Sequence, residues 1–170
     1  MARVDLELGS LYILLAKSSD RAFGLYHEIG GAGGQVTVVA RAHPDRLLKE
    51  FGIPREDVLW LSSTTGERVI NPQSVGILTD TMVRAFEREP GATVIMEGLE
   101  YLVTQNDFSK VLKMVNFIYE TVAVNQGVMV ITIDPQAFTE KELAFLLREA
   151  VTVGTKDQLL VQPFSPAARL

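Results

Sequence analysis

Apolar positions in this chain gather into short continuous runs, and the segments between them carry apolar residues at a spacing of three to four. Runs without polar alternation are typical of strands buried on both faces of a parallel sheet. Five such runs lie at residues 11–16, 36–40, 57–62, 93–96 and 127–133. A further run at 158–162 is a candidate for a sixth strand.

The intervening segments predict amphipathic helices with recognisable start signals. These signals are Ser19 or Asp20, Pro44, Asn71 with Pro72, Asn106 or Asp107, and a capping box of Thr139 and Glu142. Strands that alternate with helices predict a single three-layer α/β/α sandwich with a mostly parallel sheet. We expect it to span residues 1–162, with residues 163–170 as a loose C-terminal tail.

Composition removes several function classes. The net charge of -5 and the pI of about 5.1 disfavour nucleic acid and anionic membrane surfaces as partners. Cysteine is absent, which excludes disulfides, thiolate metal sites and a cysteine nucleophile. The sequence shows no signal segment and no apolar run near the roughly 20 residues of a spanning helix. We therefore expect a cytoplasmic protein without membrane insertion.

The run at 93–96 ends on an acid, Glu97, which Gly98 follows. The carboxyl ends of strands form the edge where open α/β sheets bind ligands. Nucleotide hydrolases hold a metal-linked carboxylate at this position. The other interpretation, which we favour, is that Glu97 caps the next turn, because the sequence offers no second anchor for magnesium.

The loop after the first strand, residues 16–23, is the segment best placed to hold phosphate. It precedes a helix, and Lys17, Ser18, Ser19 and Arg21 all carry hydrogen-bond donors. However, it has no glycine and does not match G-x-x-x-x-G-K-[ST]. We therefore interpret residues 16–23 as a surface loop with a helix cap. Weak binding of an anion or a nucleotide is the alternative hypothesis.

The glycine-rich segment 30–34 follows a helix and precedes a strand, so it predicts a helix end and not a phosphate cradle. Asp134 ends the fifth strand and joins the candidate crevice. Trp60, within the third strand, is predicted to be core. His43, after the second strand, is a loop histidine near the same edge.

Several segments resemble known families. Residues 38–52 are similar to the strand and "P-x-x-L-L-x-x-F-G" segment of RecA/KaiC-like ATPases. The segments Trp60-Leu61-Ser62, residues 94–103, Asn106-Asp107-Phe108 and Ile133-Asp134-Pro135 resemble domain of unknown function family 835, over residues 9–153. The resemblance implies a degenerate RecA/KaiC-like P-loop fold that lacks its phosphate loop. It also implies an archaeal signalling context, in which this domain is attached to sensor domains.

The leading hypothesis is a non-catalytic signalling or regulatory adaptor that acts through protein contacts. Its partner would be a protein such as a sensor or kinase component, and it would have no cofactor and no ATPase activity above background. The alternative is a nucleotide- or phosphometabolite-binding sensor, or a weak ATPase, that takes nucleotide with magnesium. Its crevice would comprise Lys17, Ser18, Ser19, Arg21, Glu97 and Asp134. A homo-oligomer is a third possibility.

Overall fold

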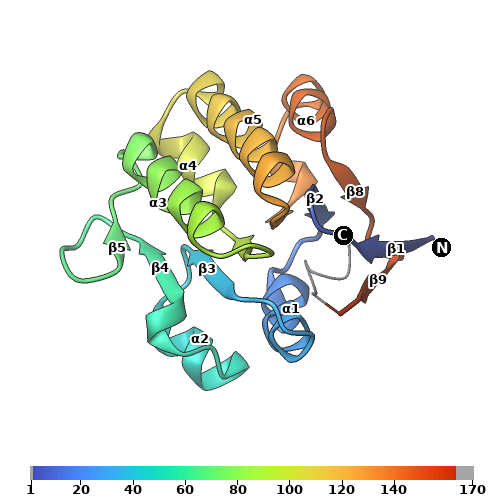
Figure 1. Cartoon of the computed structure of the whole chain (residues 1–170). Helices are drawn as coiled ribbons and strands as arrows, with labels where there is room; N and C mark the ends of the chain where they lie inside the picture. Colours follow the sequence, from blue (N-terminus) through green and yellow to red (C-terminus); the bar gives the residue numbers. More distant parts are fainter. Residues whose placement is uncertain (1, 164–170) are drawn as a thin grey trace.

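Seven strands form one sheet in which every paired strand runs parallel to its neighbour (Figure 1). The computed structural model describes residues 2–163. Across the sheet the strand order is β5-β4-β3-β6-β7-β2-β8. These strands are β2 (Ser10–Leu15), β3 (Val36–Ala40), β4 (Val58–Leu61), β5 (Val69–Ile70), β6 (Thr93–Met96), β7 (Val128–Ile133) and β8 (Val151–Val153).

Helices cover both faces of the sheet. Figure 1 shows α1 (Asp20–Gly31) and α2 (Pro44–Phe51) on one side, and α3 (Val75–Arg88), α4 (Leu99–Gln105), α5 (Phe108–Asn125) and α6 (Glu140–Leu147) on the other. The two faces carry separate apolar cores, one built around Phe23 and Leu47 and the other around Phe86 and Ile118. Every residue of β6 and β7 is buried, as continuous apolar runs require. An α/β fold with a mostly parallel central sheet between helices is therefore confirmed.

Local signals place most helix ends as expected. Pro44 stands in the first turn of α2, and Gly52 ends that helix at a φ of 64°. The capping box before α6 is complete, since Thr139 Oγ1 accepts from Glu142 N at 3.1 Å and Glu142 Oε1 accepts from Thr139 N at 2.9 Å. Helix α1 ends at Gly31, so the glycine-rich segment is a helix end.

Other elements differ from the expectation. Helix α3 begins at Val75, because Asn71 instead closes a turn by accepting from Gln73 N at 2.9 Å. The pattern does not predict α4, a helix of seven residues. Strand β9 (Gln158–Val161) does not join the central sheet but pairs in parallel with β1 (Arg3–Leu6). Two 3-10 turns, Arg55–Asp57 and Pro135–Ala137, complete the described elements.

Of the tail predicted at residues 163–170, residues 164–170 lie outside the described part of the chain. Among the helices within residues 2–163, none combines the length and the apolar character needed to cross a bilayer.

Candidate functional site

The strand order brings the candidate residues to one edge of the sheet. Lys17, Ser18 and Ser19 follow β2, Asp134 follows β7, and Glu97 follows β6. These three strands are consecutive neighbours. The chain leaves β3 towards α2 on one face and leaves β6 towards α4 on the other. Glu97 therefore lies at a topological switch point, the place where such sheets bind ligands.

The Glu97 carboxylate is held by the turn that follows β3. Its Oε1 accepts hydrogen bonds from Arg41 N at 3.2 Å and from Ala42 N at 3.0 Å, and Glu97 N donates to Val39 O at 2.8 Å. The side chain thus caps a turn, but the turn belongs to the neighbouring strand and not to the next segment of the chain. Burial raises the pKa of the Glu97 carboxyl, while the bond from Ala42 N acts in the opposite direction.

A close backbone approach fixes this arrangement. Gly98 has a φ of 108°, and a Cβ at this position would lie 3.1 Å from Arg41 Cβ and 3.3 Å from Leu61 Cδ1. Because neither that space nor that φ suits a side chain, the residue after Glu97 has to be glycine. The approach keeps β6 close enough to the Arg41 turn for both hydrogen bonds to form.

Arg41 connects the turn after β3 to helix α4 and to strand β4. Its guanidinium carbon lies 4.2 Å from the centre of the Tyr101 ring, a cation–π contact, and its Nη1 donates to Leu61 O at 3.2 Å. Trp60 Nε1 donates to Arg41 O at 3.1 Å. The sequence pattern does not single out Arg41 or Tyr101 as site residues. For Arg41, the available signal was a charged residue placed directly after a buried strand.

Trp60 was predicted to be core, but it is only partly buried. Its ring lies 4.6 Å from the ring of His43, and both border a cavity of about 440 Å³. His43 Nδ1 accepts from Asp45 N at 3.0 Å, so the side chain acts as the N-cap of α2. This histidine therefore has a local structural role at the start of the helix.

The loop predicted at residues 16–23 is shorter in the structure, because α1 begins at Asp20 and includes Arg21. The guanidinium of Arg21 donates to Gly154 O at 2.9 Å and to Asp157 O. Ser18 Oγ accepts from Asp20 N at 3.2 Å, while Ser19 forms no side-chain cap bond. Lys17 is exposed and makes no ion pair within residues 2–163. Arg21 is thus directed to the turn between β8 and β9, away from the other candidates.

Acidic side chains on this edge also have local partners. Glu100 Oε2 accepts from Asp134 N at 3.0 Å, and Asp134 Oδ1 accepts from Gln136 N at 3.0 Å. The other oxygen of Glu100, Oε1, is buried without a partner in the described residues. Over residues 2–163 no three His, Asp or Glu side chains converge in the way a metal site requires.

The model of one protein family matches this chain. That family is described as "Protein of unknown function (DUF835)", and the match covers residues 15–150. A comparison with curated proteins finds no match to the chain.

Proposed function

Since the chain belongs to the DUF835 family of proteins of unknown function, we propose that it is a non-catalytic signalling or regulatory adaptor that acts through protein contacts. Its scaffold is a degenerate RecA/KaiC-like nucleotide-hydrolase core. Its partner is a protein such as a sensor or kinase component of an archaeal signalling system. The all-parallel sheet between two helical layers supports this scaffold.

The observation that carries the proposal is the hydrogen bonding of Glu97. A carboxylate that serves a metal needs a charged oxygen directed towards the ion. Here Oε1 accepts from two backbone nitrogens, those of Arg41 and Ala42, so this oxygen is directed at the turn after β3. This hydrogen bonding suits a structural cap better than a magnesium ligand.

The loop before α1 and the first turn of that helix support the same conclusion. A phosphate loop needs glycines that let successive backbone N–H groups surround the anion. Residues 16–23 contain none, and the Arg21 guanidinium is bonded to carbonyl oxygens of the β8–β9 turn. A triphosphate would therefore find neither the backbone cradle nor that cation.

The decisive experiment measures ATP turnover with magnesium. We expect wild-type protein and the Glu97→Gln variant to show the same background rate. Magnesium-dependent turnover in the wild type, abolished by Glu97→Gln, would overturn the proposal. The substitution keeps the acceptor oxygen, so the variant should fold and a lost rate would report on chemistry.

One observation favours the alternative, a nucleotide- or phosphometabolite-binding sensor. Lys17 is exposed next to the amino end of α1, which suits an anion. A ligand that binds only the folded state raises the melting temperature with concentration. A saturable shift with one nucleotide class, lost in Lys17→Ala, would support this alternative.

A further inference from the structure

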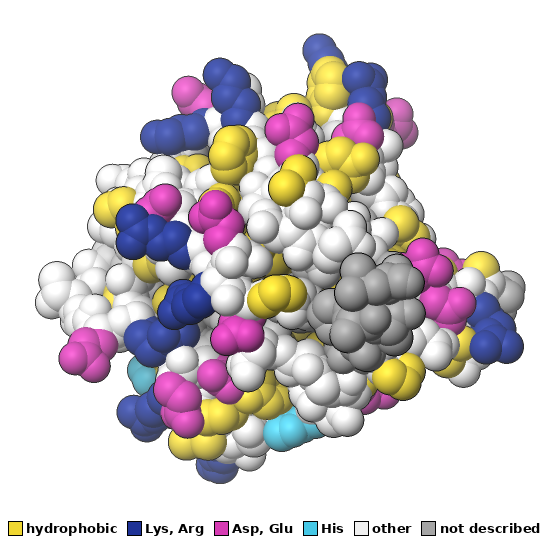
Figure 2. All heavy atoms as spheres, in the orientation of Figure 1, with side chains coloured by type: hydrophobic (Ala, Val, Ile, Leu, Met, Phe, Trp, Pro, Cys, Tyr) yellow, Lys and Arg dark blue, Asp and Glu magenta, His cyan; other side chains and the backbone are white. Residues whose placement is uncertain are grey.

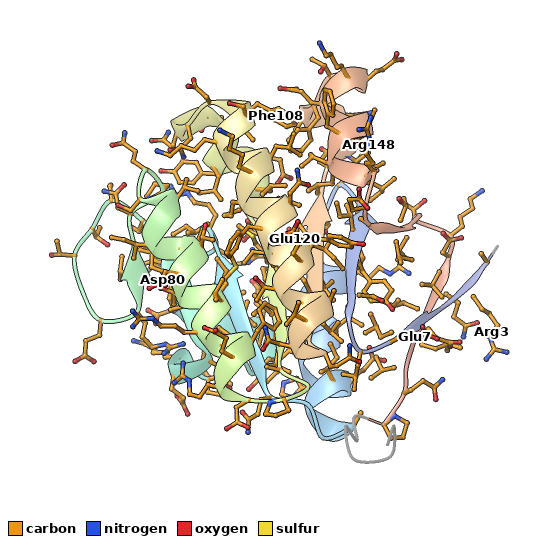
Figure 3. All side chains as sticks on the ribbon, turned by 45° about the horizontal axis from the view of Figure 1, so that its top comes forward. Arg3, Glu7, Asp80, Phe108, Glu120 and Arg148 are labelled. Atoms are coloured by element: carbon orange, nitrogen blue, oxygen red, sulfur yellow. The ribbon has the colours of Figure 1, made fainter. Side chains whose placement is uncertain are left out.

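A groove of about 440 Å³ lies between α3 and α5, on the face of the sheet opposite α1 and α2. Figure 3 shows the two helices side by side, with Asp80 on α3 and Phe108 at the start of α5. Buried side chains of Val75 and Met114 line it, together with the partly buried Val83. The groove therefore has an apolar lining that continues into the protein core.

One large apolar side chain of the lining is exposed, since Phe117 on α5 is 53% exposed. On the α3 side the lining includes Gly76 and Thr79, whose small side chains leave the surface open. An exposed aromatic side chain beside an apolar hollow offers a partner a surface to pack against.

The groove is also basic. Lys110 and Lys113 line it from α5, and neither makes an ion pair within residues 2–163. The acid on the α3 side, Asp80, is bonded to Arg84 at 3.1 Å. Figure 2 shows apolar, basic and acidic side chains mixed over the region of these two helices.

Helix orientation adds to this positive character. Both α3 and α5 lead back to the start of a parallel strand, so their amino ends lie at the same end of the helix pair. The lining runs from Val75 in the first turn of α3 to Val83, and from Lys110 to Phe117 on α5. The partial positive charge of the first helical turn acts only at the end of the groove near Val75, and the two lysines supply the rest of the positive charge. This surface is therefore positive on a protein whose net charge is -5.

We propose that the α3–α5 groove, formed by Val75, Gly76, Thr79, Val83, Met114 and Phe117, binds an amphipathic helix of a partner protein. Its apolar side chains would pack against Phe117, and its carboxylates would pair with Lys110 and Lys113. A helix fits better than a strand, because a surface made of two helices offers no free backbone ladder for strand addition. This inference rests on the proposed adaptor function and adds the chemistry of the partner.

The test selects binders from a library of displayed helical peptides with randomised surface positions, using the full chain as bait. We expect enriched sequences with apolar residues at i, i+3 or i+4, and i+7, accompanied by Asp or Glu. Synthetic versions of these peptides should lose about tenfold or more in affinity for Phe117→Ser, as for an interface anchor. The double variant Lys110→Glu with Lys113→Glu should weaken binding and prefer basic peptides instead.

The matched control is Leu48→Ser, which changes another exposed apolar residue, 45% exposed on α2 at the opposite face. It should bind the selected peptides as the wild type does. An unchanged melting temperature for Phe117→Ser shows that the variant is folded, since this side chain is half exposed.

Three results would overturn the inference. These are the absence of enriched sequences, enriched peptides that bind both variants as tightly as wild type, and a wild-type dimer that Phe117→Ser dissociates. The last would make a second copy of the chain the occupant. The ATP measurement separates this inference from the proposed function, because turnover would overturn the function whether or not the groove binds peptides.

Discussion

Glu97 Oε1 accepts a hydrogen bond from Ala42 N at 3.0 Å, across 55 positions of sequence. The same oxygen accepts from Arg41 N, so one carboxylate satisfies both donors of the turn after β3. A side chain used in this way holds two neighbouring strands in register at their carboxyl ends. We therefore expect replacement of Glu97 to change the free energy of unfolding, whether or not it changes any activity.

Replacing Glu97 should separate its acceptor role from its charge. Glu97→Ala leaves Arg41 N and Ala42 N without an acceptor and should cost about 1–3 kcal/mol of unfolding free energy. Glu97→Gln keeps an acceptor oxygen in place and should not show this loss. Denaturant midpoints of the three proteins measure this. Equal destabilisation by Ala and Gln would show that the charge matters more than the hydrogen bonds.

The pKa of Glu97 predicts how stability depends on pH. Burial raises this pKa in the folded state, so the folded protein binds more protons than the unfolded chain between the two pKa values. The contribution of Glu97 to stability is then fully present below the unfolded value, which is 4.5, and falls as pH rises through the folded value. The Glu97→Gln variant should therefore gain stability relative to wild type from about pH 4.5 upwards.

Asp157 provides the contrast for that experiment. Its pKa is lowered, first by the bond from Gly154 N and then by the bond from Ala2 N. A lowered pKa gives stability that is present above the unfolded value of 3.8 and is lost as pH falls through the folded value. Acid titration of Asp157→Asn against wild type should thus show a difference that shrinks below pH 3.8, opposite in sign to that of Glu97.

The sheet could be predicted from sequence because its central strands are buried on both faces. Strands β6 and β7 contain no exposed residue, and this produces an unbroken apolar run. Strand β8 has two exposed residues out of three, Val151 and Thr152, so its sequence contains no continuous apolar run that would predict a strand. Strand β1 depends on its pairing with β9, a contact between chain ends that no local pattern reveals.

The candidate site was only partly predictable for a related reason. The position of Glu97 at a strand end follows from the pattern, but its partners depend on β3 lying next to β6. Local signals do not specify strand order, so they could not show that Arg41 and Glu97 meet. The same holds for Arg21, whose acceptors Gly154 and Asp157 lie 133 and 136 positions away.

Gly98 should not tolerate a side chain. Its φ of 108° is strained for alanine, and the new Cβ would press on Arg41 Cβ at 3.1 Å. Gly98→Ala should lower the unfolding free energy by about 1–3 kcal/mol. Gly24→Ala is the control, because Gly24 lies inside α1 with no atom within 4 Å of a new Cβ. That change should stabilise the helix by up to about 1 kcal/mol.

Arg21 should act as a structural clamp for the chain ends. Its guanidinium donates to Gly154 O and Asp157 O, while Asp157 Oδ1 accepts from Ala2 N beside β1. Arg21→Ala should cost about 1–2 kcal/mol and should speed amide hydrogen exchange in β1 and β9 more than in the central sheet. Lys17→Ala, in the loop just before α1 and exposed, should change stability by less than about 0.5 kcal/mol. The opposite result is that Arg21→Ala leaves hydrogen exchange in β9 unchanged and removes a nucleotide-induced shift in melting temperature. That result would show that Arg21 binds the ligand, and it would support the nucleotide-binding sensor.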